Sequence, residues 1–176
     1  MFPAACLTSR TIMRPIMASD AAAIFDGYAQ DQDVTRFLTW KPHRSRDDTD
    51  AYIAHCLATD PAHARTYVLC DRRDGRVRGA MDLRRFGGHR LEFGYVLARR
   101  WWGQGLMTEV LREVVAWVFT QPALFRIGAV CDVENVASAR VMEKADLALE
   151  GCLHRWSVHP NMGDEPRDCL IYGKCR

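Results

Sequence analysis

Long apolar runs are missing from this sequence of 176 residues. No apolar segment approaches the roughly 20 residues of a membrane-spanning helix, so we expect no membrane partner. The first fifteen residues, MFPAACLTSRTIMRP, lack a basic segment followed by a long apolar stretch, and no signal peptide is therefore predicted.

A strong charge of either sign is also missing. The chain has 24 Lys and Arg residues against 22 Asp and Glu residues, which leaves a formal net charge of +2. This near balance gives no reason to expect nucleic acid as a partner. The hydrophobic content of 48% is ordinary for a globular protein. We expect residues 1–176 to form a single domain with a sizeable core.

Clustered metal ligands and paired cysteines are absent as well. The seven cysteines are scattered, their number is odd, and no two of them form a C-x-x-C pair. The six histidines are equally dispersed. A zinc site or a disulfide framework would need clustering. We therefore predict no bound metal and expect reduced, mostly buried thiols in a cytoplasmic protein.

The order of strand and helix signals indicates a mixed α+β fold. Strands are predicted at 7–16, 65–70, 76–86, 89–97, 124–131, 148–158 and 167–175. Helices are predicted at about 21–29, 45–57 and 135–142, together with a long one that ends near 119. Ser19 or Asp20 is expected to cap the first helix, and Ser45 the second. The pattern predicts a mixed sheet with helices on its faces.

A glycine-containing loop, RRWWGQGLMTE at 99–109, lies between a predicted strand and the long helix. The first N–H groups of a helix have no internal acceptor, and the helix dipole adds positive charge, so an anion can bind there. Gly103 and Gly105 would let a phosphate approach the main chain. Trp101 and Trp102 are expected to anchor the loop against the core. Neither the dinucleotide fingerprint nor a Walker A loop is complete here, which argues against a nucleotide-binding domain of another fold.

The residues Arg100, Gly103 and Gly105 form an R-x-x-G-x-G motif. It resembles the pyrophosphate-binding motif of the GNAT superfamily of acyl-CoA-dependent N-acyltransferases. NVASARVMEKADLALEG, at 135–151, resembles the second cofactor segment of that superfamily. Together with LEFGYVL and PRDCLIYGK, these segments resemble the RimJ/RimL-type branch, which acetylates protein N-termini and various amines.

The resemblance implies a mostly antiparallel, twisted sheet of about seven strands with about four helices. The fourth and fifth strands should splay apart, and the free backbone at the end of the fourth strand should pair with the pantetheine arm of acetyl-CoA. Main-chain N–H groups after that strand should hold the pyrophosphate. The implied cofactor-binding residues are Val96, Leu97, Arg100, Trp102, Gly103, Gln104, Gly105, Leu106, Met107 and Asn135. Helix capping alone would also explain Asn135.

The implied reaction is acetyl transfer from acetyl-CoA to a primary amine by direct attack in a ternary complex. The amine would belong to a protein N-terminus or a small molecule. A non-catalytic acyl-CoA-binding module and a transferase that uses succinyl-CoA or another acyl-CoA remain alternatives. The turn-rich segments 37–43 and 159–166 are expected to select the acceptor, with Trp40 and Trp156 either in its pocket or packed in the core. The sequence is compatible with a monomer and with a homodimer.

Two residues are candidates for proton transfer. Glu92 lies at the position that matches the catalytic glutamate of several superfamily members, and the alternative role is an ion pair with a nearby arginine. Many relatives carry a tyrosine that protonates the sulfur where this chain has Met142, which cannot donate a proton. Ser138 precedes Met142 by one helical turn on the same face, so its hydroxyl is a candidate for that role. The alternative for Ser138 is local helix hydrogen bonding.

The sequence also predicts the backbone conformation at Asp146 and one side-chain pair on the long helix. Asp146 stands where the family usually has glycine, so we expect a left-handed backbone there. Glu109 and Arg112 are expected to form a solvated pair on the long helix.

Overall fold

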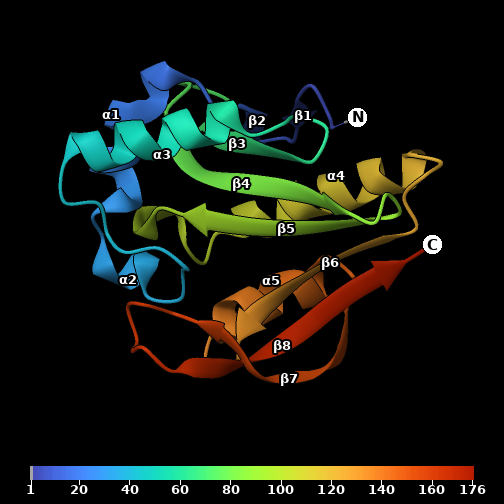
Figure 1. The fold of residues 1–176 in the computed structure, drawn as a ribbon. Helices are drawn as coiled ribbons and strands as arrows, with labels where there is room; N and C mark the ends of the chain where they lie inside the picture. Colours follow the sequence, from blue (N-terminus) through green and yellow to red (C-terminus); the bar gives the residue numbers. More distant parts are fainter. Residues whose placement is uncertain (1) are drawn as a thin grey trace.

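The computed structural model describes residues 2–176, which form an eight-stranded sheet with helices on both faces (Figure 1). The strands are β1 (Cys6–Leu7), β2 (Thr11–Pro15), β3 (Ala64–Asp71), β4 (Val77–Phe86), β5 (Arg90–Leu97), β6 (Arg126–Asp132), β7 (Ala148–Val158) and β8 (Pro166–Cys175). Their order across the sheet is β1-β2-β3-β4-β5-β6-β8-β7. The predicted α+β class is confirmed.

The helices divide between the two faces of the sheet. They are α1 (Ala21–Ile24), α2 (Gln32–Thr35), α3 (Arg46–Ala58), α4 (Leu106–Thr120) and α5 (Val136–Lys144). On one face, Ile24 of α1 and Ile53 of α3 share a buried cluster with Val68 of β3. On the other face, Leu111 of α4 and Met142 of α5 belong to the larger core cluster. Each helix therefore buries its apolar side against one face of the sheet.

The one parallel pairing in the sheet is also the shortest between long strands. β5 pairs with β6 only at Arg90–Arg126, Leu91–Ile127 and Glu92–Gly128, whereas every other neighbouring pair is antiparallel. Beyond Glu92 the two strands diverge, as Figure 1 shows. The predicted splay between adjacent central strands is confirmed, and it leaves backbone groups of β5 without a neighbouring strand.

The N-terminal third departs from the prediction in detail. The strand expected at 7–16 is interrupted by a tight turn, in which the Thr8 N–H donates to the Thr11 carbonyl, so it forms β1 and β2 and the sheet has eight strands. The helix expected at 21–29 continues from α1 as a π-helical turn over Phe25–Ala29. The short α2 was not predicted and raises the number of α-helices to five.

The predicted helix caps are wrong at two positions. Asp20 accepts from the Met17 N–H at 2.8 Å and pairs with Arg14, so it closes the preceding turn instead of capping α1. Ser45 does precede α3, but its hydroxyl makes no capping hydrogen bond. Asp48 of the first turn reaches back instead and accepts from the Arg44 N–H. A carboxylate in the first turn of a helix also complements the helix dipole.

The expected pair of Glu109 and Arg112 is also wrong. Glu109 accepts from the Ser9 hydroxyl at 2.9 Å and from Arg10 Nε at 2.7 Å, which ties the β1–β2 turn to the first turn of α4. Arg112 donates instead to the Lys144 carbonyl at the end of α5. Sequence spacing on one helix could not reveal either partner, because both lie far away in the chain.

The expectation for Asp146 is met. Asp146 has a φ of 61°, the left-handed conformation expected after α5. All seven cysteines are free; three are buried, two are partly buried, and Cys152 and Cys175 are exposed. Within residues 2–176, no helix is both long enough and apolar enough to cross a bilayer.

Candidate active site

The loop before α4 adopts a backbone that requires glycine. Gly103 and Gly105 have φ values of 71° and 73°, and Gly105 is the N-cap of α4. A Cβ at Gly103 would meet no atom within 4 Å, and one at Gly105 would meet only Arg10 Nη2, at 3.9 Å. Packing therefore does not demand glycine at either position. The left-handed backbone does, and the space beside it is open to a ligand.

Aromatic and polar side chains hold this loop in place. The Trp101 ring lies 4.1 Å from the Arg78 guanidinium carbon, in a cation–π contact on β4. The Trp102 indole Nε1 donates to the Leu97 carbonyl at 2.6 Å. Gln104 Nε2 donates to the Arg100 carbonyl at 2.9 Å, which closes the loop upon itself. Both tryptophans hold the loop, but only Trp101 packs against the core as expected, because Trp102 is exposed.

A groove of about 650 Å³, called here the cofactor groove, runs from the end of β5 past this loop to α5. Eight of the ten predicted cofactor residues line it: Val96, Leu97, Trp102, Gly103, Gly105, Leu106, Met107 and Asn135. Arg100 and Gln104 are not part of its lining. Four cationic residues that sequence reasoning missed also line the groove, namely Arg36, Arg99, Arg140 and Lys144. Arg99 pairs with Asp33, which also lines the groove, and Arg36 pairs with Glu134. Arg140 and Lys144, together with the N-terminus of α4, make the groove suited to an anionic ligand.

The backbone of β5 presents alternate residues to the gap between β5 and β6. The Ala98 N–H donates to the Arg78 carbonyl, so Ala98 forms a hydrogen-bonded pair with β4. Because such pairs alternate along an antiparallel ladder, Val96 also directs its main-chain groups to β4, while Tyr95 and Leu97 direct theirs to the gap. Of the two residues predicted to pair with pantetheine, only Leu97 therefore offers its backbone there. Tyr95 is the other.

A second cavity of about 640 Å³, called here the acceptor chamber, lies beside the cofactor groove. The segment 37–43 lines it through residues that include Trp40 and His43, and His159 lines it from the other predicted segment. The Trp40 ring lies 5.0 Å from the His43 ring and 6.4 Å from the Tyr52 ring. Trp156, in contrast, is 59% exposed and does not line the chamber.

The two cavities have six lining residues in common. These residues are Phe37, Leu38, Tyr95, Val96, Asn135 and Ser138. Ser138 and Asn135 belong to the start of α5, and Tyr95 and Val96 to the diverging half of β5. The groove and the chamber therefore meet across the splay.

Ser138 is held by partners on both sides of the splay. Its N–H donates to Asn135 Oδ1 at 3.1 Å, so Asn135 caps α5. Its Oγ accepts from the Tyr95 hydroxyl at 2.9 Å. The hydroxyl is thus engaged by a residue of β5 and not in local helix bonding, which was the alternative role for Ser138. Asn135 caps the helix and also lines both cavities.

The start of α5 is fixed by a buried ionic network. Asp132, at the end of β6, accepts from Arg167 Nε at 2.6 Å and from the Glu134 N–H at 2.8 Å. Burial would raise the pKa of Asp132, but the Arg167 hydrogen bonds outweigh it and lower the pKa. The Asp132 carboxylate therefore stays charged and orients the β6–α5 connection that carries Ser138.

Two carboxylates line the acceptor chamber on neighbouring strands. Glu92 lies 3.7 Å from Arg90 in a loose ion pair and also lines the chamber, so both roles considered for it have a structural basis. Asp82 of β4, which sequence reasoning missed, pairs with Arg84 and lines the chamber as well. Burial raises the pKa of Asp82, and Arg84 only partly opposes this effect. Asp82 is therefore a second candidate for the acceptance of a proton.

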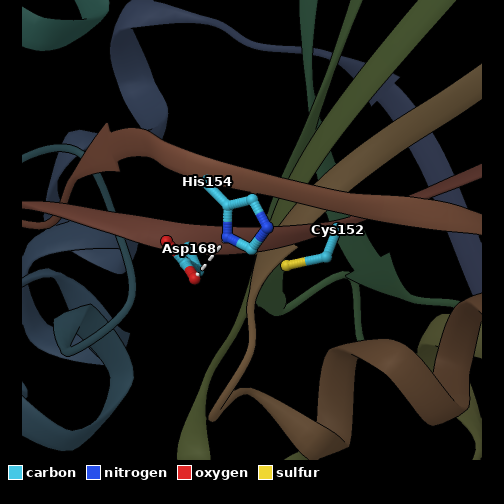
Figure 2. A group of neighbouring side chains, drawn as sticks. All are labelled: Cys152, His154 and Asp168. Carbon is cyan, nitrogen blue, oxygen red and sulfur yellow. Dashed lines mark hydrogen bonds and ion pairs between the residues drawn. The ribbon is translucent and has the colours of Figure 1, made fainter.

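Residues 2–176 contain a group of potential metal ligands on β7 and β8, away from both cavities. It comprises Cys152, His154 and Asp168, whose ligand atoms lie within 4.8 Å of one another (Figure 2). His154 Nδ1 is hydrogen-bonded to Asp168 at 2.9 Å, and Asp168 also accepts from the Arg155 N–H. Each of the three residues offers one ligand atom, and the Asp168 carboxylate has lone pairs beyond those that accept these two hydrogen bonds. The pairing of β7 with β8 is irregular between Leu153 and Ser157, and Arg155 has a φ of 47°.

Comparison with known proteins identifies the family. Residues 10–148 match the profile of the acetyltransferase (GNAT) domain. The chain belongs to the GNAT acetyltransferase family. It is 31% identical over 168 residues to the uncharacterized N-acetyltransferase YoaA of Bacillus subtilis, a match that covers 94% of this chain and 93% of the relative. The resemblance seen in the sequence is confirmed, and the chain is an acyltransferase by family.

Solved structures share its fold. A GNAT-family acetyltransferase from Bacillus anthracis superposes with a TM-score of 0.85 at 23% identity, over 97% of this chain and 98% of that one. RimL, a ribosomal L7/L12 alpha-N-protein acetyltransferase solved in complex with coenzyme A, superposes with a TM-score of 0.85 at 18% identity, over 97% of each chain. Both likenesses show that this chain shares the fold of these proteins.

Proposed function

We propose that this GNAT protein transfers an acetyl group from acetyl-CoA to a primary amine, of a protein N-terminus or a small molecule, by direct attack in a ternary complex. The observation that carries the proposal is the meeting of the cofactor groove and the acceptor chamber at Ser138 and Tyr95. A thioester that enters from the groove and an amine that enters from the chamber would come together at that point. The RimL complex with coenzyme A supports a CoA-type donor.

The residues of the cofactor groove fit acetyl-CoA. The N–H groups from Trp102 to Met107 would hold the pyrophosphate, since Gly103 and Gly105 leave open space at the start of α4. The main chain of Tyr95 and Leu97 would pair with the pantetheine arm as an added strand does. Arg140 and Lys144 of the groove would attract the remaining phosphate charge.

The chemistry requires two proton movements. The neutral amine nitrogen attacks the thioester carbonyl carbon, the C–S bond breaks, and its electron pair stays on sulfur. The amine nitrogen loses a proton toward Glu92, directly or through water, and the sulfur gains one from Ser138. Asp82 is the alternative proton acceptor on the chamber side.

The lining of the acceptor chamber favours an amine with an apolar group beside it. Asp82 and Glu92 give the chamber negative charge that attracts an ammonium group, and the cluster of Trp40, His43 and Tyr52 offers an aromatic wall. The amine must lose its proton before attack. An α-amine with a pKa near 7.7–8.0 costs about 3.5 kcal/mol less to deprotonate than a lysine amine near 10.4.

The test is a screen of purified protein with acetyl-CoA and succinyl-CoA against peptide N-termini, lysine-type amines and small aromatic amines. Free CoA thiol is measured as a rate, and the acylated amine is identified by mass spectrometry. We expect amine-dependent release of CoA with acetyl-CoA and a 1:1 yield of acetylated amine. Tight CoA binding without thioester loss beyond buffer hydrolysis, across all amines, would instead support a binding module.

A further inference from the structure

The hydroxyl of Tyr95 is the one side-chain group on β5 that reaches across the splay to the proposed proton donor. Tyr95 lies three residues beyond Glu92, the last β5 residue paired with β6. Its ring stacks on Phe93 with centroids 6.5 Å apart, and its hydroxyl lies 2.9 Å from Ser138 Oγ on α5. Tyr95 also lines both cavities.

The direction of this hydrogen bond follows from the acidity of the two hydroxyl groups. A phenol is the stronger acid and the better donor, while an aliphatic hydroxyl is the better acceptor, so Tyr95 donates and Ser138 accepts. Burial raises the pKa of Tyr95 to about 12, and the bond to Ser138 only partly opposes this rise, so Tyr95 keeps its proton at neutral pH. Because Tyr95 occupies one lone pair of Ser138 Oγ, the hydrogen of Ser138 remains available for donation; the Cys131 sulfur lies within its reach, and the CoA sulfur would compete for it.

A serine hydroxyl by itself is a weak acid, because an alkoxide is a high-energy product. The tyrosine that many relatives carry on this helix is replaced by Met142, which is fully buried and has no proton to give. The nearest phenol to the proposed donor comes from β5 instead. Tyr95 can therefore remedy the weakness of Ser138 from the opposite side of the splay.

We propose that Tyr95 is a positioning residue that acts through Ser138, aiming the serine hydroxyl at the sulfur and replacing the proton that it gives up. This inference rests on the proposed acetyl transfer. As the C–S bond breaks, sulfur takes the Ser138 proton and Ser138 Oγ takes the Tyr95 proton. The Tyr95 oxygen then regains, through water in the acceptor chamber, the proton that the attacking amine has passed to Glu92. The charge and the number of protons balance, and no further reactant is needed.

Tyr95→Phe removes only the hydroxyl and keeps the ring that packs on Phe93. We expect kcat to fall by about 10–100-fold, with the KM for acetyl-CoA and the melting temperature near those of the wild type. The double variant Tyr95→Phe with Ser138→Ala should be no slower than Ser138→Ala alone, because the two residues act as one unit. Tyr172→Phe is the matched control, since its buried hydroxyl donates to Glu143 outside both cavities. It should lower stability and leave kcat unchanged.

A second measurement needs no acceptor amine. The thiol of bound CoA is titrated by its thiolate absorbance in the wild type and in both single variants. Loss of the aimed serine hydrogen should raise the thiol pKa in Ser138→Ala and in Tyr95→Phe by a similar amount. An unchanged thiol pKa and kcat in Tyr95→Phe, beside a clear effect of Ser138→Ala, would refute the role of Tyr95 alone. Wild-type protein that binds CoA and transfers no acetyl group would refute the proposed function, and the thiol titration would still decide whether Tyr95 acts through Ser138.

Discussion

The indole nitrogen of Trp102 donates a hydrogen bond of 2.6 Å to the carbonyl oxygen of Leu97. The bond joins the end of β5 to the loop that carries Gly103 and Gly105. The Leu97 carbonyl faces the gap between β5 and β6, and this bond occupies it. The N–H of Leu97 and the main-chain groups of Tyr95 therefore remain available to hydrogen-bond the pantetheine arm. The Trp102 side chain therefore fixes the end of β5, where pantetheine is proposed to bind, relative to the main chain of Trp102 to Met107, called here the pyrophosphate cradle.

Substitution of Gly105 by valine tests whether the pyrophosphate cradle binds acetyl-CoA. The side chain would occupy the open space at the start of α4, where the pyrophosphate is proposed to lie, and we expect acetyl-CoA affinity to fall by more than about tenfold, or about 1.4 kcal/mol, in calorimetry. The variant also strains the backbone, because φ is 73°.

Gly88→Val is the matched control for that strain. Gly88 has a φ of 77° and open space around it, and it does not line the cofactor groove. Both variants should lose similar stability, but only Gly105→Val should lose affinity. Equal affinities of the two folded variants for acetyl-CoA would show that the pyrophosphate cradle is not part of the cofactor site.

Substitution of Ser138 by alanine tests the proton donor. We expect turnover to fall by about 10²–10³-fold, the scale of positioned acid catalysis, because the sulfur loses its donor as the C–S bond breaks. Acetyl-CoA affinity should change little, since the loss falls on the transition state. Ser45→Ala, at a hydroxyl without a capping hydrogen bond, serves as the control. Wild-type turnover of Ser138→Ala would mean that water or another group protonates the sulfur.

Glu92→Gln separates a base from an ion-pair partner of Arg90. If Glu92 accepts the amine proton, the rate defect should be largest at low pH, where the amine is mainly ammonium. The defect should shrink as the pH passes the amine pKa and should be larger for a lysine-type acceptor than for an α-amine. The measurement is the pH–rate profile with both acceptors, run beside Asp82→Asn. A constant ratio to the wild type at every pH would exclude Glu92 as the base.

Glu109 should contribute to stability in a defined pH range. Burial alone would raise its pKa, but hydrogen bonds from Thr8, Arg10 and Ser9 outweigh it and lower the pKa from 4.5 to about 2. A depressed carboxyl pKa stabilises the folded state above the unfolded value, and this contribution is lost as the pH falls from about 4.5 toward 2.

Glu109→Gln should therefore lower the unfolding free energy at pH 7 by about 1 kcal/mol and flatten the loss of stability below pH 4.5. Glu165→Gln is the control, because its carboxylate is 86% exposed and lies 3.4 Å from Arg155. Urea unfolding at pH 7, 4.5 and 3 measures the difference. Parallel stability curves for Glu109→Gln and the wild type would contradict the assigned role.

The sequence by itself determined the element order, the glycine-containing loop and the family. These features are local, because each is set by residues close together in the chain. They include the unpaired N–H groups at the start of a helix, the glycines at left-handed positions and the N-cap asparagine at 135. The left-handed backbone at Asp146 followed from the same reasoning, and the structure shows it. The placement of Ser138 one turn before Met142 needed only the helical period.

Only the tertiary structure decided which distant residues meet. Tyr95 and Ser138 are 43 positions apart, and the partners of Glu109 lie about a hundred positions earlier, so no periodicity could relate them. In the sequence Asp82 looks like any strand residue, and only the fold places it in the acceptor chamber. Trp156 is a pocket candidate in the sequence, and only the fold shows that it is exposed. Burial and long-range pairing depend on how strands are ordered and where they diverge. The three-pair contact between β5 and β6 therefore created the site, and the local sequence could not specify its far side.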